Sequence, residues 1–410
     1  MSEFFTVLPP AEALAKLWEA LLIAPRPETI PTAEALSRVT WEAITAPSPL
    51  PTFPRSTMDG YAVRAQDTFG ASASLPVYLN VIGEVPMGAA PTFELRPAQA
   101  ALVHTGGMMP TGANAVVQIE NTQPVRAAEV EVTKAVGVGE NTVKVGEDVA
   151  EGEVVLPAGH WLRPQDLGGL LALGVTSLKV AARPRVALLA TGDEVVSPEA
   201  EAGPGQIRDI NSYTVAGLVT RAGGVPMLCG IVRDNFDALL KSAARALAGA
   251  DALILSAGSS VSVRDMTADV INGLGKPGTL VHGVAVKPGK PTLLAVAEGK
   301  PVFGLPGNPV SALVIADLFV TPTLYRMQGC QTPPRRPSVW ARLTHNLASA
   351  PGREDYIPAK LVERDSELWA EPVFGKSNLI YTLIRADGLL TIPADANGLS
   401  AGERVEVRLF

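Results

Sequence analysis

The chain has 410 residues, of which 47% are hydrophobic, and carries a formal net charge of −7. This length exceeds one ordinary hydrophobic core, so we expect two to four domains. The acidic balance argues against nucleic acid or an anionic membrane as the main partner, because both repel a negatively charged surface. An anionic ligand would therefore need a local site of opposite charge.

The cysteines and the lack of targeting signals argue against several other classes of protein. The two cysteines, Cys229 and Cys330, lack C-x-x-C spacing, which predicts neither a zinc site nor a disulfide framework. Residues 1–22 lack the basic start and compact apolar stretch of a signal peptide, and we expect no apolar run of membrane-spanning length. The four histidines show no H-x-x-x-H or Ser–His grouping. These features predict a cytoplasmic protein and give no support to a nucleophile-and-base mechanism.

The first part of the chain predicts a helical domain with a β insertion. Apolar residues at helical spacing predict amphipathic helices over 11–22 and 32–44. Proline and serine then interrupt the pattern from residue 46 to residue 54. Short β-branched runs separated by glycine between residues 75 and 155 predict an all-β module. A further helix, predicted over 165–173, would return to pack against the N-terminal helices.

The rest of the chain predicts two more domains. From Arg185 strands and helices alternate, which predicts a doubly wound α/β domain with a parallel sheet and helices on both faces. After a proline-rich linker at 332–337, alternating strands predict a small C-terminal β barrel or sandwich. The predicted division of the chain is 1–45 with 140–182, 46–139, 183–330 and 331–410.

Several polar side chains follow strands of the α/β domain. In such sheets ligands bind beyond the carboxyl ends of the strands, so these side chains would line one crevice. Capping is the alternative for Asn308, and two solvated surface lysines are the alternative to a phosphate clamp. The residues concerned are Asp193, Glu194, Asp234, Asp265, Asp269, Lys287, Lys290 and Asn308.

The stretch 252–272 predicts a strand, a small-residue loop and a helix. Such a loop lets backbone amides approach an anion at a helix N-terminus. Asp265 and Asp269 stand at the start of this helix, where they would repel a phosphate unless a cation lay between them, which indicates a metal. Helix capping by Asp265 explains the same pattern equally well.

Four further loops are candidate binding sites, and for the two in the first half of the chain a hairpin corner or a plain loop is the alternative. The Asp59-Gly60 pair is a turn signal inside an extended passage, and a small-residue turn begins at Thr105. The remaining two loops, 352–356 and 375–378, lie in the predicted C-terminal β domain.

Four motifs in order resemble the molybdopterin molybdenumtransferase family, which includes the C-terminal domain of gephyrin. The resemblance covers essentially the whole chain. The motifs are Ser56-Thr-Met-Asp-Gly-Tyr-Ala-Val-Arg64, Thr191-Gly-Asp-Glu194, Lys287-Pro-Gly-Lys-Pro291 and Gly304-Leu-Pro-Gly-Asn-Pro-Val-Ser311.

The resemblance implies an enzyme that inserts molybdenum from molybdate into adenylylated molybdopterin and releases AMP, with Mg²⁺ as the cation. It also implies a homodimer whose active site lies between the α/β domain of one subunit and the β insertion of the other, and an upstream molybdopterin adenylyltransferase as a possible partner. The carboxylates implied to be catalytic are Asp59, Asp148, Glu194, Asp234 and Asp265, with Asp265 and Glu194 as metal ligands. The implied substrate-binding residues are Thr105, Thr191, Gly192, Ser256, Ser260, Lys287, Lys290, Gly307, Asn308 and Ser377.

One loop departs from the family pattern. Members usually carry Ser-Gly-Gly-Val-Ser-Val-Gly where this chain has Ser256-Ala-Gly-Ser-Ser-Val-Ser262, so that Ala257 and Ser262 replace glycines. Glycine permits a positive φ that alanine and serine resist, so the replacement bears on the conformation of the loop.

Two other functions compete with the transferase. A non-catalytic pterin-binding scaffold would bind the ligand without releasing AMP. A nucleotide-processing enzyme could use the same α/β domain, but such relatives lack the long β insertion with Asp59.

Overall fold

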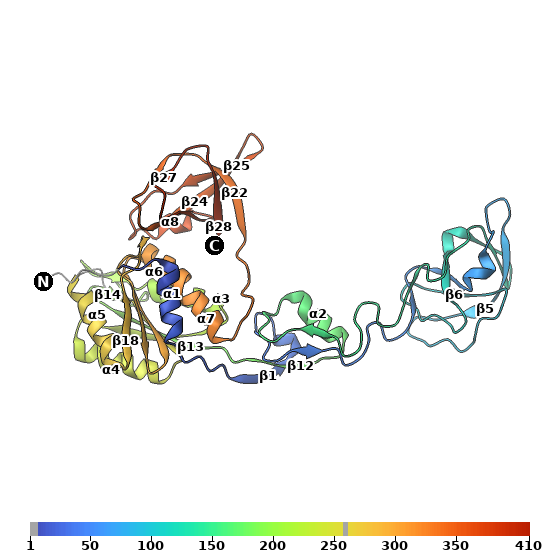
Figure 1. The fold of residues 1–410 in the computed structure, drawn as a ribbon, viewed down its shortest axis with the longest axis horizontal. Coiled ribbons are helices and arrows are strands. Elements are labelled where there is room, and N and C mark those ends of the chain that lie inside the picture. Colours follow the sequence, from blue (N-terminus) through green and yellow to red (C-terminus); the bar gives the residue numbers. More distant parts are fainter. Residues whose placement is uncertain (1–6, 257–260) are drawn as a thin grey trace.

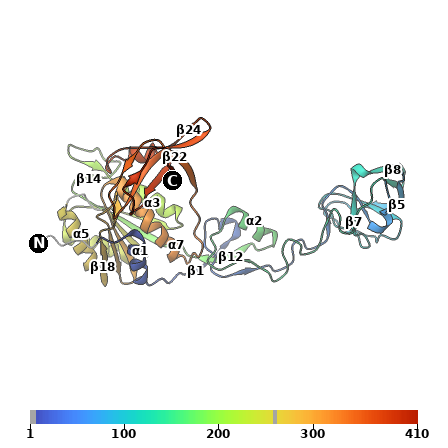
Figure 2. The same cartoon turned by 45° about the horizontal axis from the view of Figure 1, so that its top comes forward.

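The computed structural model describes residues 7–256 and 261–410, apart from the side chains of residues 261–265. The molecule is elongated, and its bodies follow one another along the long axis (Figure 1). An α/β domain with the C-terminal barrel beside it forms one end, a small middle body follows, and a β lobe forms the far end. The turned view in Figure 2 shows the same separation.

The α/β domain is built on one six-stranded sheet with the strand order β16-β13-β17-β21-β20-β18. The first four strands of this order run parallel to one another, whereas β20 is antiparallel to both β21 and β18. The sheet is therefore parallel over four strands and mixed at one edge. The strands are β13 (Arg185–Thr191), β16 (Val225–Val232), β17 (Ala252–Ser256), β18 (Pro277–His282), β20 (Leu293–Ala297) and β21 (Lys300–Leu305).

Helices cover both faces of this sheet, which confirms the doubly wound prediction. Alternation along β13 separates two cores, because Val186 and Leu188 enter one apolar cluster while Ala187 and Leu189 enter the other. The helices are α3 (Asn211–Arg221), α6 (Pro309–Ile315), η4 (Ala316–Val320) and α7 (Thr321–Met327) in the first cluster, and α4 (Phe236–Ala248) and α5 (Val261–Gly273) in the second.

The N-terminal helix α1 (Pro10–Glu19) belongs to the α/β domain. Its buried residues Ala13 and Leu17 join the same apolar cluster as α3 and α7, and α1 packs on β18 and β20. The predicted helix over 11–22 is thus confirmed with a shift in its bounds. It does not pack beside α2 (Pro164–Ala172), which lies in the middle body (Figure 1).

The predicted helix over 32–44 is wrong. This segment holds only the 3₁₀ turn η1 (Thr32–Glu34), and Ser37 has a positive φ of 59°. The amides of Ser37 and Thr40 donate to the carbonyls of Leu162 and His160 instead of to carbonyls one helical turn earlier. Long-range backbone pairing has overridden the local apolar spacing.

The middle body consists of two short ribbons and one helix. The ribbons pair β1 (Pro27–Pro31) with β12 (Ser177–Ala181), and β2 (Ile44–Thr45) with β11 (Val154–Leu156). Each ribbon pairs the segment that leads to the β lobe with the segment that returns from it. Two stretches of chain therefore connect the lobe to the rest of the molecule. A third short ribbon pairs β3 (Arg55–Ser56) with β10 (Thr142–Val143) near the lobe.

The β lobe is a curled six-stranded sheet with the order β7-β4-β6-β5-β9-β8 around its own apolar cluster. Five of these strands lie between residues 75 and 155, which confirms the all-β module predicted there. The strands are β4 (Gly60–Val63), β5 (Val77–Glu84), β6 (Gln99–Val103), β7 (Ala115–Gln118), β8 (Thr122–Arg126) and β9 (Glu129–Val132), with 3₁₀ turns η2 (Ala65–Thr68) and η3 (Ile119–Asn121).

The C-terminal domain is a closed barrel, because β24 pairs with both β25 and β26. Its Tyr356 and Leu389 enter the apolar cluster of the α/β domain, which joins the two domains. The barrel strands are β22 (Ser338–Leu343), β24 (Glu354–Arg364), β25 (Glu367–Pro372), β26 (Gly388–Ile392) and β28 (Arg404–Leu409), with α8 (Tyr381–Ile384) and the short pair β23 (Leu347–Ala348) and β27 (Gly398–Leu399) beside them.

Our expectation about apolar runs needs one correction. The continuous helical stretch Pro309–Met327 is long and apolar enough to cross a membrane by length and composition, but 61% of it is buried inside the protein. Phe319 and Leu324 in this stretch are fully buried in the α/β core. The stretch therefore has the character of a core helix.

Candidate functional site

The α/β sheet places a crevice at the ends of two neighbouring strands. Strand β13 lies between β16 and β17, so the chain leaves β13 for one side of the sheet and later returns to the other side. Ligands bind at such reversal points, beyond the carboxyl ends of the strands. Thr191 ends β13, Ser256 ends β17, and Gly307 and Asn308 follow β21. Together with Glu194 they line a cavity of about 430 Å³.

A second and larger cavity, of about 860 Å³, lies between the α/β domain and the barrel. The α/β domain contributes Lys287, Lys290 and Asn308 to its wall, and the barrel contributes Arg353 and Ser377. The structure thus brings together the Lys-Pro-Gly-Lys turn and the predicted serine of the C-terminal domain, which are about 90 residues apart in sequence.

Asn308 joins the two cavities. Its Nδ2 donates a hydrogen bond to Ser377 Oγ at 3.0 Å, and the amide of Val310 donates to the carbonyl of Ser377 at 3.1 Å. Asn308 stands at the N-cap of α6 but makes no side-chain capping hydrogen bond. The capping alternative for Asn308 is therefore wrong, and its side chain instead connects the α/β domain to the barrel.

The acidic residues after β13 and β16 lie close together. The hydroxyl of Thr191 donates to Asp234 Oδ1 at 2.8 Å, and the amide of Asp234 donates to Asp193 Oδ1 at 3.3 Å. Gly192 between them has a φ of +150°, and a Cβ there would lie 2.8 Å from a carboxylate oxygen of Glu194. Glycine suits this turn because residues with a side chain rarely adopt this φ, and an added Cβ would also crowd Glu194 and Val195.

The first lysine of the predicted clamp is not a free surface cation. Lys287 Nζ lies 3.7 Å from Asp355 Oδ2, and Arg353 Nε donates to Asp355 Oδ1 at 2.8 Å. Strand β19 (Val286–Lys287) pairs in parallel with the start of β24, which brings this lysine to the buried Asp355. Sequence reasoning singled out the loop 352–356 as a whole but missed Arg353, because nothing local distinguishes this arginine from a solvated one.

Asp59 and Thr105 form a local unit in the β lobe, just before β4 and just after β6. The amide and the hydroxyl of Thr105 donate to Asp59 Oδ1 at 2.8 and 3.2 Å. These hydrogen bonds, the backbone one first, lower the pKa of the exposed Asp59 carboxyl, because they favour its charged form. Asp59 is therefore held as a carboxylate that faces solvent.

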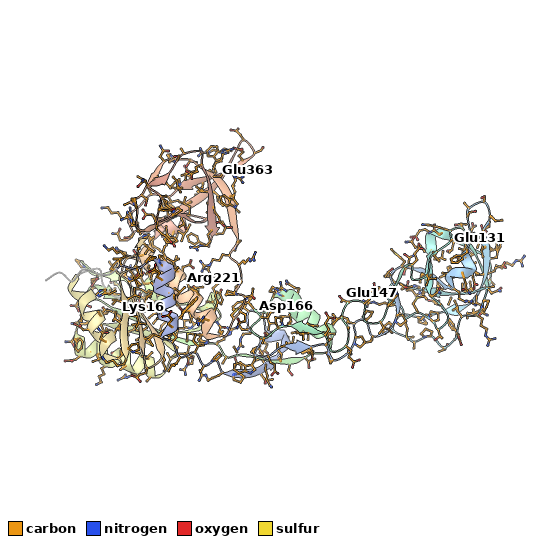
Figure 3. All side chains as sticks on the ribbon, viewed as in Figure 1. Lys16, Glu131, Glu147, Asp166, Arg221 and Glu363 are labelled. Atoms are coloured by element: carbon orange, nitrogen blue, oxygen red, sulfur yellow. The ribbon has the colours of Figure 1, made fainter. Side chains whose placement is uncertain are left out.

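Asp59 and Thr105 lie far from the two adjoining cavities of the same chain, which together form its cleft. The lobe strands β5 and β6 are at one end of the molecule and β13 is at the other (Figure 1). Glu147, which precedes the predicted Asp148, lies between the middle body and the lobe (Figure 3). Asp59, Thr105 and Asp148 are thus not brought together with Glu194 and Asp234 within one chain.

Two predicted residues cannot be placed at the site. Ser260 lies outside the described residues, as does Ala257. The backbone at Asp265 belongs to α5, but its side chain is outside the description, as is that of Ser262. Metal binding and capping by Asp265 both remain predictions. Among the described residues, no group of three or more His, Cys, Asp or Glu side chains could by itself hold a metal ion.

Three family models match the chain in sequence. They are the MoeA N-terminal region (domain I and II) over residues 8–174, the "Probable molybdopterin binding domain" over 187–326, and the MoeA C-terminal region (domain IV) over 340–410. The chain belongs to the MoeA family. The first matched region covers α1, most of the middle body and the β lobe, and the other two cover most of the α/β domain and the C-terminal barrel.

Individual members of this family resemble the chain over nearly its full length. Molybdopterin molybdenumtransferase 2 of Mycobacterium tuberculosis is 36% identical, with 94% of this chain and 96% of the relative covered. The molybdopterin molybdenumtransferase of Bacillus subtilis is 33% identical, with 93% and 90% covered. The crystal structure of the molybdopterin biosynthesis MoeA protein from Pyrococcus horikoshii OT3 matches with a TM-score of 0.85 and 33% identity, covering 99% of this chain and all of that one.

Proposed function

We propose that the chain is a molybdopterin molybdenumtransferase, which inserts molybdenum from molybdate into adenylylated molybdopterin and releases AMP. The observation that carries the proposal is the pair of adjoining cavities, one lined by cations and one bordered by carboxylates, with Asn308 in the wall of both. Full-length similarity to proteins named for this activity supports it. The chain is accordingly an enzyme of molybdenum cofactor biosynthesis.

The two cavities suit the two kinds of group that must react. Molybdate and the phosphoanhydride are both anions, so they need local positive charge in a protein of net charge −7. Lys287, Lys290 and Arg353 supply that charge in the larger cavity. Glu194, at the smaller cavity, can orient an attacking oxygen by accepting its proton.

The atoms balance without a protein nucleophile. An oxygen from water forms a new bond to the phosphorus of AMP while the phosphoanhydride bond breaks and AMP leaves. Molybdenum forms two bonds to the dithiolene sulfurs and loses one oxygen, which departs as water with the two thiol protons. The water that is consumed and the water that is released cancel. An upstream molybdopterin adenylyltransferase would supply the adenylylated substrate.

The carboxylates at the smaller cavity suit a Mg²⁺ ion that is bound by both the protein and the substrate. Mg²⁺ is usually held by one or two carboxylates together with substrate phosphates and water, not by an all-protein cage. Glu194 and Thr191 line the smaller cavity. Asp234 accepts a hydrogen bond from the Thr191 hydroxyl and so lies next to this cavity. Glu194, Asp234 and Asp265 would hold the ion, which would polarise the phosphorus and neutralise developing charge.

A homodimer would complete the site. Asp59 and Thr105 are pre-assembled on the β lobe, yet the lobe of the same chain lies at the opposite end of the molecule from the cleft (Figure 1). In a twofold dimer each lobe can approach the partner's cleft, because one interface generates two equivalent composite sites. Asp59 would then add a carboxylate to the acidic wall of the partner's cleft. Asp148, which lies on the connection to the same lobe, would approach that cleft with it.

The test is AMP release from adenylylated molybdopterin, measured with and without molybdate and Mg²⁺. We expect release to require both, and we expect Glu194→Gln to lower its rate by about 10² to 10³. Glu363→Gln, a change at an exposed barrel residue remote from both cavities, is the matched control (Figure 3). Ligand binding without any AMP release would favour a non-catalytic scaffold and contradict the proposal.

A further inference from the structure

The larger cavity carries an unbalanced charge. Among the described residues that line it, four have cationic side chains and only one has a carboxylate. The cations are Lys287, Lys290, Arg353 and Lys376, and the carboxylate is Asp355. The lining therefore carries a formal excess of positive charge, although the whole chain is acidic. Such a surface raises the local concentration of anions.

The single carboxylate is already shared by two of these cations. Asp355, only 2% exposed, lies 2.8 Å from Arg353 Nε and 3.7 Å from Lys287 Nζ. Within the described part of the chain, neither Lys290 nor Lys376 has a carboxylate within 4 Å of its ammonium group. These two lysines therefore keep their full charge for a ligand, whereas Lys287 and Arg353 are partly neutralised.

The two unpaired lysines come from different domains. Lys290 ends the Lys-Pro-Gly-Lys turn of the α/β domain, and Lys376 lies in the barrel loop that follows β25. The next residue, Ser377, is fastened to the α/β domain by the hydrogen bonds from Asn308 Nδ2 and from the amide of Val310. The backbone at Lys376 is thus held at the domain junction, although its long side chain is exposed.

We propose that Lys376 is a further substrate-binding residue that, together with Lys290, binds the oxyanion substrate molybdate. Two unpaired ammonium groups match the charge of a tetrahedral dianion, and the neighbouring Ser377 hydroxyl can donate a hydrogen bond to one of its oxygens. In the proposed function, a Mg²⁺ ion held at the smaller cavity would neutralise the phosphoanhydride separately. This inference rests on the proposed function, since it assigns one substrate of that reaction to one cavity.

Binding measurements on the full chain separate molybdate from the nucleotide. Sodium molybdate and AMP are titrated in turn against the wild type, Lys376→Gln and Lys376→Arg by calorimetry at low salt. We expect Lys376→Gln to raise the Kd for molybdate about tenfold and to leave that for AMP unchanged, because one charge-assisted hydrogen bond is lost. Lys376→Arg keeps the charge, so it should restore most of the affinity for molybdate.

Lys360→Gln removes an equal charge from an exposed position of β24 that does not line the cavity, and serves as the control. Equal molybdate affinities for Lys376→Gln and Lys360→Gln would overturn the role of Lys376 and leave the transferase proposal intact. Weaker AMP binding with unchanged molybdate binding would overturn the assignment to molybdate. A wild-type protein that binds no molybdate and releases no AMP would overturn both proposals.

In steady-state AMP release the same variant should raise the KM for molybdate about tenfold with little change in kcat, because Lys376 contacts the substrate before and during the reaction alike. A loss confined to kcat would contradict a binding role. Raising the salt concentration should narrow the difference between Lys376→Gln and the wild type, since the lysine is exposed and its charge is screened.

Discussion

The cleft of the α/β domain and the Asp59–Thr105 pair of the β lobe assemble their polar residues by different means. In the cleft, sheet topology and domain packing collect Thr191, Ser256, Lys290 and Asn308 from four separate segments. In the lobe, a neighbouring turn presents Thr105 to Asp59 within one small sheet. The cleft is an interdomain site with two cavities, whereas the lobe presents an exposed carboxylate with an ordered partner.

This difference has a consequence for assembly. The two ribbons and the helix of the middle body hold the lobe away from the cleft of its own chain (Figures 1 and 2). The middle body is thus a spacer, and such a spacer serves a composite site only if a second subunit supplies the missing half. Changes made separately in the cleft, the lobe and the spacer can therefore test whether the two regions act together.

The largest effect is expected from subunit mixing. Asp59→Asn and Glu194→Gln should each lower AMP release by about 10² to 10³, because each removes a carboxylate from every composite site. An equal mixture that has been allowed to exchange subunits should recover about one quarter of the wild-type rate, since half of the dimers then contain one intact site of two. A mixture as inactive as its components would contradict a site shared between subunits.

The next effect concerns the turn that carries the cleft lysines. Gly289 has a φ of +119°, and a Cβ there would lie 2.5 Å from two side-chain carbons of Ile315, which is fully buried. Gly289→Ala should displace Lys287 and Lys290 and lower kcat/KM by about 10², the usual result of misplacing groups by about 1 Å. The assay is AMP release, with binding of molybdate measured in parallel.

Gly217→Ala is the matched control for this change. Gly217 lies within α3, and a Cβ added there would have no atom of a neighbouring segment within 4 Å. Alanine should therefore leave activity unchanged and stabilise the helix by about 0.5 to 1 kcal/mol. Full activity of Gly289→Ala would show that the geometry of the turn does not matter to the reaction.

A smaller effect is expected at the junction of the two cavities. Asn308→Ala removes the hydrogen bond to Ser377 that joins the α/β domain to the barrel loop. We expect kcat/KM to fall about tenfold, which corresponds to one lost interdomain hydrogen bond of about 1 to 1.5 kcal/mol. Ser377→Ala breaks the same bond and also removes the hydroxyl that can donate to molybdate, so it should lower kcat/KM at least as much. Adding Asn308→Ala to Ser377→Ala should then cost little more, because the shared bond is already lost.

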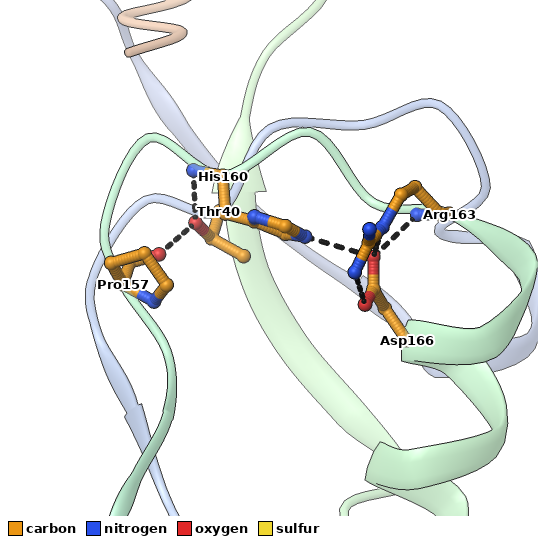
Figure 4. Close-up of polar contacts among 5 residues, drawn as sticks. All are labelled: Thr40, Pro157, His160, Arg163 and Asp166. Atoms are coloured by element: carbon orange, nitrogen blue, oxygen red, sulfur yellow. Dashed lines mark hydrogen bonds and ion pairs between the residues drawn. The ribbon is translucent and has the colours of Figure 1, made fainter. Parts of the chain in front are cut away.

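The smallest effect on activity is expected in the spacer. Asp166, at the start of α2, accepts hydrogen bonds from the side chain and amide of Arg163 and lies 2.8 Å from His160 Nε2 (Figure 4). Burial by itself would raise the pKa of Asp166, but the hydrogen bonds from Arg163 and His160 together outweigh it and lower the pKa to about 2. The charged form of Asp166 therefore stabilises the folded spacer.

Asp166→Asn should lower the free energy of unfolding by about 2 kcal/mol at neutral pH, with little change in kcat. Because the folded pKa lies below the unfolded value, this contribution is present above about pH 4 and disappears as the pH falls toward about 2. Guanidinium unfolding of the variant and the wild type across this range measures it. Glu147→Gln, on the connection beyond the spacer, is the control, and a pH-independent difference would contradict the assignment.

Local patterns predicted much of this molecule. Alternating runs located the strands of the lobe and the barrel, and the strand-and-helix order from Arg185 predicted the doubly wound sheet. The rule that ligands bind beyond strand ends correctly predicted that Asn308 lines the cleft. The same local reasoning failed over 32–44, where backbone pairing with the returning chain replaced a helix.

Short-range periodicity and residue type are enough to define most of the elements and the chemistry available after each strand. Which side chains are free to act depends instead on tertiary contacts. These contacts pair Lys287 and Arg353 with one buried carboxylate and leave Lys290 and Lys376 without such a partner among the described residues. They also hold the β lobe, which carries Asp59, at the opposite end of the molecule from β13 (Figure 1), because contacts between distant segments, which no local pattern records, decide that placement.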